Sequence, residues 1–188
     1  MKLLAFAAAL RTASLNRLLI RQAAAILREA PDIDLDLADF REFEMPMYDG
    51  DLEARDGIPP GGVEFIRRIQ MADGLVIATP EYNGGIPGTL KNAIDWASRT
   101  DPIPFEGKPV VLLGASPGGL GAVRGLAHCR VPLQTIGAYV YPDMFGLPRA
   151  HQAFDASGAF LDRHQQTRLQ DLLHAYLAFV GKLSTTRS

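Results

Sequence analysis

Short apolar runs recur along the chain, and stretches in which apolar residues return at helical spacing separate them. Most of the runs are continuous and rich in β-branched residues, which is typical of parallel strands that are buried on both faces. The second run alternates apolar and polar residues after Pro31, so it predicts an edge strand. The predicted strands are residues 3–9, 33–37, 75–78, 109–115 and 135–141.

The periodic stretches predict helices between these strands. They cover residues 14–30, 62–72, a segment after Pro87, a segment from Gly121 to about Arg130, and residues 159–182. Residues 41–60 lack periodicity and carry turn residues, so we expect an irregular loop there. Alternation of strand and helix predicts one α/β domain over residues 1–188, built on a doubly wound parallel sheet.

The segment from Leu75 to Trp96 is the most informative part of the chain. Pro80 ends the predicted strand because proline cannot donate a ladder hydrogen bond. Asn83, Gly84 and Gly85 can adopt positive φ, which allows a sharp turn with backbone N–H groups facing outward. Lys91 and Asp95 form a predicted i,i+4 pair on the helix that follows. In an open α/β sheet, a loop at the carboxyl end of a strand is where ligands bind.

A second candidate loop joins the first strand to the first helix. A phosphate placed there would meet the free N–H groups and the positive end of the helix dipole. Ser14 and Asn16 could add hydroxyl and amide donors, and Arg11 a guanidinium. On these residues alone, the simpler interpretation is that Ser14 caps the helix and Arg11 is a solvated charge.

The loop after the fourth run, from Gly114 to Gly118, fits the pattern G-x-S-x-G of a serine-hydrolase nucleophile elbow. Asp143 with His151 or His164 would have to complete a triad with Ser116. The residue after the serine normally gives an N–H to the oxyanion hole, but here it is Pro117, which has none. Loss of one such donor typically costs about a hundredfold or more in turnover, which disfavours a hydrolase.

Pro80-Glu81-Tyr82-Asn83 followed by Gly-x-Pro-Gly-x-Leu-Lys-Asn-Ala-Ile-Asp-Trp resembles the signature of the NADPH-dependent FMN reductase family, which includes chromate, quinone and azo-dye reductases. The resemblance runs from the first strand to about Tyr141. It implies a flavodoxin-like five-stranded parallel sheet with strand order 2-1-3-4-5 and helices on both faces. It also implies bound FMN, with NADPH or NADH as co-substrate.

The family's flavin contacts can be carried over to matching positions of this chain. The loop after the third predicted strand would lie along the isoalloxazine ring, with Pro80, Glu81, Tyr82, Asn83 and Gly84 as its contacts. The segment with Arg11, Ser14, Leu15 and Asn16 would hold the phosphate, and Ser116, Gly118 and Gly119 would close over the flavin. The chain has Ala8, Ala9 and Ala13 where the family usually has Gly, Ser and Gly.

The resemblance implies that the cofactor carries the chemistry, so no catalytic acid or base and no metal ligand is assigned. Hydride would pass from the nicotinamide to the flavin and on to a quinone, a chromate-like oxyanion, an azo compound or free flavin. A homodimer or homotetramer is also implied, with subunit contacts near Tyr82 and Trp96. An electron-carrying flavodoxin and a scaffold without cofactor stay open as alternatives, although carriers are usually strongly acidic.

Composition narrows the range of partners. The 188 residues include 19 basic and 21 acidic ones, a net charge of -2, without the basic excess expected of a nucleic-acid-binding protein. No apolar run approaches the length of a membrane span, and Arg11 interrupts the first one without a signal-peptide pattern. Cys129 is the only cysteine, so we expect it to be buried, and we expect a cytoplasmic protein.

Overall fold

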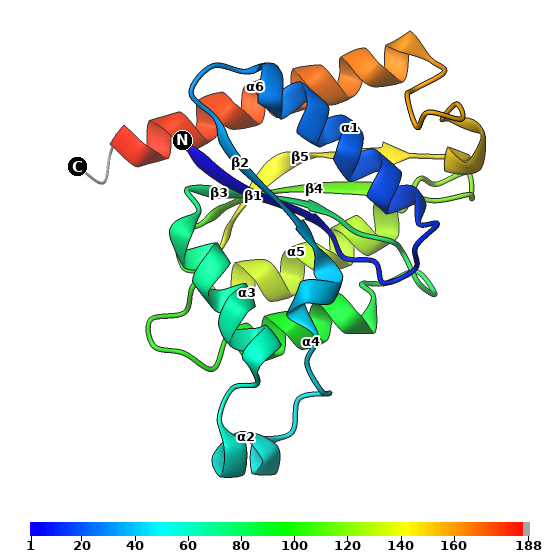
Figure 1. Cartoon of the computed structure of the whole chain (residues 1–188). Helices are drawn as coiled ribbons and strands as arrows, with labels where there is room; N and C mark the ends of the chain where they lie inside the picture. Colours follow the sequence, from blue (N-terminus) through cyan, green and yellow to red (C-terminus); the bar gives the residue numbers. More distant parts are fainter. Residues whose placement is uncertain (186–188) are drawn as a thin grey trace.

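Five parallel strands pair side by side in the order β2-β1-β3-β4-β5 in the computed structural model, which describes residues 1–185 (Figure 1). Because all neighbouring pairs are parallel, the carboxyl ends of the strands lie at one edge of the sheet. The predicted strand order is confirmed. The strands are β1 (Lys2–Ala7), β2 (Asp34–Asp39), β3 (Gly74–Ala78), β4 (Pro109–Ala115) and β5 (Tyr139–Leu147).

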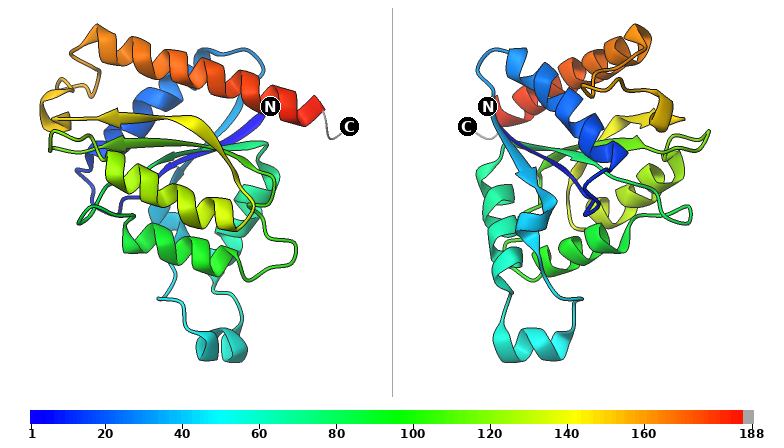
Figure 2. Two further views of the ribbon diagram at one scale, coloured as in Figure 1. Left: turned by 180° about the vertical axis from the view of Figure 1, so that it is seen from behind. Right: turned by 45° about the vertical axis from the view of Figure 1, so that its right-hand side comes forward.

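Helices cover both faces of this sheet, as expected (Figures 1 and 2). One face carries α1 (Leu15–Glu29) and α6 (Arg163–Thr185), and the other carries α3 (Pro60–Met71), α4 (Gly88–Ala97) and α5 (Val123–Thr135). Alternate residues of β1 divide between the two layers, since side chains along a strand point to opposite faces. Within residues 1–185, none of the helices is long and apolar enough to cross a membrane.

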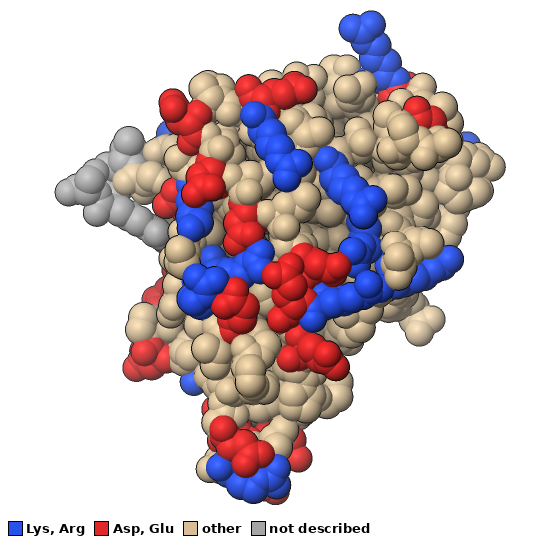
Figure 3. Space-filling model, in the orientation of Figure 1, with Lys and Arg blue, Asp and Glu red and all other residues tan. Residues whose placement is uncertain are grey.

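The central strands are buried on both sides, which explains their continuous apolar sequences. Every residue of β3 and β4 is buried, whereas β2 is partly exposed at the edge of the sheet. Ion pairs of Arg17 with Asp39 and of Arg68 with Asp36 border this edge strand, and acidic and basic side chains are intermixed on that face (Figure 3). Charges along an edge strand discourage pairing with other chains.

Cys129 lies in the core between the sheet and α5, as the sequence predicted. Burial raises the pKa of its thiol to about 12, so the thiolate is scarcely populated at neutral pH. The cysteine therefore acts as a small apolar side chain.

The prediction of an irregular loop over residues 41–60 is correct only for residues 44–49 and 57–59. A short 3₁₀ helix, η1 (Phe40–Phe43), follows β2, and a further helix, α2 (Gly50–Asp56), follows it. Asp39 and Asp49 cap the two helices through their carboxylates, and such short capped helices lack the periodicity that reveals longer ones. None of the residues of α2 is buried, and the helix projects from the body of the molecule (Figure 2).

The boundary between the fourth helix and the last strand also differs from the prediction. Helix α5 continues to Thr135 despite Pro132, and Gly137 (φ 84°) turns the chain into β5, which starts at Tyr139 instead of residue 135. The strand then extends through Pro142 to Leu147. The register of its pairing with β4 shifts between Val110 and Leu112, an irregularity of the kind that lets a strand accommodate proline.

Candidate cofactor site

Loops that follow β1, β3 and β4 meet at the carboxyl edge of the sheet, on the right-hand side of Figure 1. We name them loop 1 (residues 8–14), loop 2 (residues 79–87) and loop 3 (residues 116–122). The chain leaves β1 toward β2 on one side and β3 lies on the other, so the strand order reverses between β1 and β3. Ligands of doubly wound sheets bind at this kind of switch point.

Loop 1 presents a row of unpaired backbone donors. The structure gives the N–H groups from Leu10 to Leu15 no acceptor among residues 1–185, whereas those of Ala8 and Ala9 bond to Ala78 and Ala7. Ser14 caps α1, since its Oγ accepts a hydrogen bond from the Asn16 N–H at 3.2 Å. The loop thus combines free N–H groups with a helix N-terminus, the arrangement that binds phosphate.

The side chain of Asn16 makes two hydrogen bonds within the protein. Its Nδ2 donates to the Ala115 carbonyl at 3.0 Å, and its Oδ1 accepts from the Ala115 N–H at 2.8 Å. The residue is 2% exposed. Because Nδ2 carries two N–H bonds and only one of them goes to Ala115, the expected donation from this amide to a phosphate stays a prediction. Asn16 ties the start of α1 to the end of β4, and so loop 1 to loop 3.

Two arginines flank loop 1, and the sequence pointed to only one of them. Arg11 is exposed and makes no ion pair or hydrogen bond with residues 1–185. Arg41, from η1, donates from Nε and Nη2 to the Leu10 carbonyl at 3.0 and 2.5 Å and from Nη2 to Thr12 Oγ1 at 2.8 Å. Arg41 was missed because it lies in the stretch predicted as an irregular loop.

The alanines that depart from the family pattern differ in exposure. Ala8 and Ala9 are buried, whereas Ala13 is exposed at the tip of loop 1. A hydroxyl at position 9 would therefore lie inside the protein in this conformation.

Loop 2 forms a tight turn. Asn83 and Gly84 have positive φ angles of 52° and 76°, as expected for Asn-Gly. The N–H groups of Tyr82 and Gly85 donate to each other's carbonyls at 3.1 and 3.0 Å, so the Gly85 N–H does not face outward as expected. The N–H groups of Asn83 and Gly84 have no acceptor among residues 1–185, and Tyr82 is 57% exposed beside them.

Glu81 directs its carboxylate to α5. Oε1 accepts from Arg124 Nε at 2.9 Å and Nη2 at 2.5 Å, and Oε2 accepts from the Gly125 N–H at 2.9 Å. Burial acts to raise the pKa of the Glu81 carboxyl, but the hydrogen bonds from Gly125 and Arg124 outweigh it and the pKa is lowered. The side chain of Glu81 is engaged within the protein, as that of Asn16 is.

Loop 3 does not have the features of a nucleophile elbow. Ser116 Oγ accepts from the Gly118 N–H at 3.2 Å, and the Ser116 N–H and carbonyl bond to Leu147 and Ala150. Ser116 has no positive φ angle, and its hydroxyl bonds to no histidine among residues 1–185. Gly119 is exposed. The loop is a hydrogen-bonded turn after β4 rather than a strained nucleophile site.

Replacement of Ser116 by Ala is expected to change flavin affinity by less than about tenfold, because it removes one neutral hydrogen bond within the turn. The wild type should have no esterase activity that the replacement could abolish. The measurement is flavin binding together with hydrolysis of p-nitrophenyl acetate by wild type and variant. Ester turnover in the wild type that the variant lacks would contradict this interpretation of loop 3.

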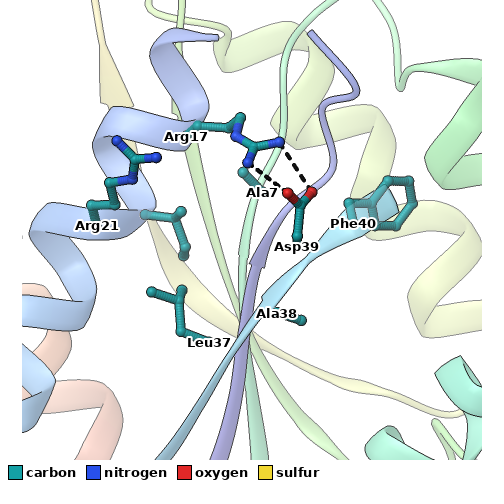
Figure 4. A pocket seen from close by; sticks show the side chains of 8 residues that line it. Ala7, Arg17, Arg21, Leu37, Ala38, Asp39 and Phe40 are labelled. Atoms are coloured by element: carbon teal, nitrogen blue, oxygen red, sulfur yellow. Dashed lines mark hydrogen bonds and ion pairs between the residues drawn. The ribbon is translucent and has the colours of Figure 1, made fainter. Parts of the chain in front are cut away.

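A separate hollow of about 170 Å³ lies between α1 and β2 (Figure 4). Arg17 closes one side of it through bonds to both carboxylate oxygens of Asp39 at 3.0 and 2.6 Å. The hydrogen bond from Arg17 lowers the pKa of the Asp39 carboxyl, which stays ionised and balances the arginine. Arg21 also lines the hollow. Among residues 1–185 no cluster of His, Cys, Asp and Glu could hold a metal ion.

Known reductases are similar to this chain over most of its length. The chain is 38% identical over 184 residues to an NAD(P)H-dependent FMN reductase from Pseudomonas aeruginosa, covering 97% of this chain and 96% of the relative. It is 35% identical to a quinone reductase from Escherichia coli, covering 74% of this chain and 76% of the relative.

Solved structures agree with the fold. The structure of FerB, a flavoenzyme NAD(P)H:(acceptor) oxidoreductase from Paracoccus denitrificans, matches with a TM-score of 0.83 and 29% identity, covering 96% of this chain and 97% of that one. Flavodoxin 1 from Bacillus cereus, at 13% identity, covers 94% of this chain and 97% of that one with a TM-score of 0.60, and shows the flavodoxin-like fold alone. The family model for NADPH-dependent FMN reductase matches residues 1–152. With its switch-point loops and these relatives, the chain belongs to the NADPH-dependent FMN reductase family.

Proposed function

We propose that this protein binds FMN across loops 1, 2 and 3 and uses it to pass electrons from NADPH or NADH to a small-molecule acceptor. As a member of its family it is a flavin-dependent oxidoreductase. The assignment of the site rests on one observation: the N–H groups from Leu10 to Leu15, up to the start of α1, have no acceptor in the described part of the chain. These donors and the helix dipole suit a dianionic phosphate, and Arg11 adds a free guanidinium.

The residues of loops 2 and 3 suit the edge of a flavin ring. Asn83 and Gly84 offer N–H donors, and Gly119 presents backbone without a side chain. Pro80, Tyr82, Ser116 and Gly118 are proposed to border the same space. Ser14 and Leu15 are proposed to face the phosphate through the start of α1. Glu81 and Asn16 are proposed to act indirectly, since their polar atoms bond within the protein.

When bound, FMN supplies the two-electron chemistry between the nicotinamide and the acceptor. The protein's part is to orient the ring and the phosphate through preorganised backbone donors. No side chain of the proposed site needs to act as an acid or a base. The loops are fixed by Asn16, Glu81 and Arg41, so the donors are in place before a ligand arrives.

We propose an aromatic acceptor such as a quinone, and a cavity of about 430 Å³ supports this proposal. It borders loop 1 through Leu10 and the first turn of α4 through Thr89, and its walls include Phe40, Phe43 and Met47. Cavities of this size with mainly apolar walls and a few polar groups suit small planar ligands. Flexible methionines adapt to rings of different shape.

We further propose a cytoplasmic homo-oligomer formed by a single domain over residues 1–188. Helix α2 buries none of its residues and Met47, at its base, is 73% exposed, so this projection supports a subunit contact. Tyr82 is exposed and can also contribute. Trp96 is fully buried, where its Nε1 donates to the Pro46 carbonyl at 2.8 Å, so its role in a contact would be to support the projection. Size-exclusion chromatography with light scattering tests the oligomeric state.

The function is tested with the apoprotein and added FMN. Binding is expected to shift the flavin spectrum and quench its fluorescence, and NADPH or NADH should then bleach the flavin anaerobically. A quinone should restore the colour. If saturating FMN changes neither spectrum nor fluorescence, the proposal fails. Bleaching that requires a separate reductase protein would indicate an electron carrier instead.

A further inference from the structure

Helix α5 begins without a cap of its own. The residue before it, Ala122, has a left-handed conformation (φ 65°) and no side chain that can accept a hydrogen bond. The first N–H groups of a helix need acceptors from outside the helix, and Ser, Thr, Asn or Asp usually provides one at this position. An alanine therefore leaves the start of α5 dependent on another part of the chain.

Glu81 provides the missing acceptor from loop 2. Its Oε2 accepts from the N–H of Gly125, the third residue of α5, at 2.9 Å, although the two residues are 44 positions apart in sequence. A carboxylate at this place also interacts favourably with the positive end of the helix dipole. The Glu81 side chain is 8% exposed, so water hardly competes for this bond, whereas Arg124 is 59% exposed. The bond to Gly125 is therefore the stronger restraint, and the ion pair adds less.

On the helix, Gly125 also allows this contact, because it has no side chain. A Cβ atom at Gly125 would lie 2.9 Å from Glu81 Cβ and 3.1 Å from its Cα, which is closer than side-chain atoms pack. Only glycine lets loop 2 approach α5 this closely. Both partners are thus fitted to one short distance between the loop and the helix.

The position of this contact connects the two loops proposed to border the flavin ring. Glu81 immediately precedes the turn of Tyr82 to Gly85, and α5 starts directly after loop 3. We propose that Glu81, Arg124 and Gly125 form a latch that fixes the spacing between loops 2 and 3, and that Glu81 is a positioning residue for the flavin ring rather than a ligand of it. This inference rests on the proposed function.

The latch predicts a distinctive pattern of flavin affinities. Glu81→Ala and Gly125→Ala should each weaken FMN and riboflavin by the same factor, about five- to twentyfold, because the ring is common to both ligands. Glu81→Gln keeps an oxygen acceptor for Gly125 and should recover most of the affinity. Arg124→Gln should weaken the affinity for both flavins by about twofold, since the ion pair of Arg124 is exposed.

Gly50→Ala is the matched control for the added methyl group. Gly50 lies on the projecting helix α2, and a Cβ atom there would lie 3.9 Å from Tyr48 Oη, which is an ordinary contact. The affinity of this variant for both flavins should equal that of the wild type. All titrations are made well below the melting temperature of each apoprotein, so that loss of folded protein does not contribute.

Flavin affinities unchanged in Glu81→Ala and Gly125→Ala, with only the apoprotein melting temperature lowered, would show a structural cap and overturn the proposal. A loss confined to FMN would place Glu81 at the phosphate and overturn it as well. If Glu81→Ala does not fold, Gly125→Ala decides in the same way. Absence of flavin binding by the wild type would instead refute the proposed function itself.

Discussion

Asn16→Ala is expected to lower the free energy of unfolding of the apoprotein by about 2–4 kcal/mol. The Asn16 amide serves both the N–H and the carbonyl of Ala115, which are buried at the end of β4. Leaving a buried polar group unpaired costs roughly 1–3 kcal/mol for each group. For a chain of this length the loss corresponds to about 5–15 °C in melting temperature.

Thermal and urea unfolding followed by circular dichroism measure this loss. Gln22→Ala is the matched control, because Gln22 lies on the same helix and its amide donates to the Gly158 carbonyl at 2.7 Å. We expect that control to lose about 1 kcal/mol. A melting temperature of Asn16→Ala equal to that of the control would mean that water or a backbone shift satisfies Ala115. The anchoring role assigned to Asn16 would then be incorrect.

Arg11→Ala is expected to weaken FMN binding by about ten- to a hundredfold and to leave riboflavin binding unchanged. A hydrogen bond to a charged group contributes roughly 1.5–3 kcal/mol, which corresponds to this range. Riboflavin lacks the phosphate, so it reports on the ring site alone. Fluorescence titration of both flavins with wild type and variant measures the difference.

Two further variants sharpen the test. Arg11→Lys keeps the charge without the planar fork and should show an intermediate loss. Arg21→Ala removes an arginine of α1 that lines the hollow beside β2, and this variant should bind FMN as the wild type does. Equal FMN affinity in Arg11→Ala and the wild type would show that Arg11 is not at the phosphate. Equal losses in Arg11→Ala and Arg21→Ala would indicate a general effect of net charge.

The sequence predicted the sheet well because its signals are periodic and local. The continuous apolar runs of β3 and β4 and the alternation in β2 follow directly from burial on two faces or on one. The extent of β5 was mispredicted, because Pro142 resembles the end of a strand when its pairing partner is unknown. Helix α2 was missed since it is short, exposed and without an apolar stripe.

For the candidate site, the sequence by itself determined the features that one short segment can encode. The Asn83-Gly84 turn, the Ser14 cap and the unpaired donors at the start of α1 each depend on neighbouring residues alone. The tertiary structure alone decided which polar groups remain available. Asn16 bonds to a residue 99 positions away, Glu81 to one 44 away, and Arg41 to one 31 away. These partners meet because the strand order brings their loops to one edge of the sheet, and no local pattern specifies that order.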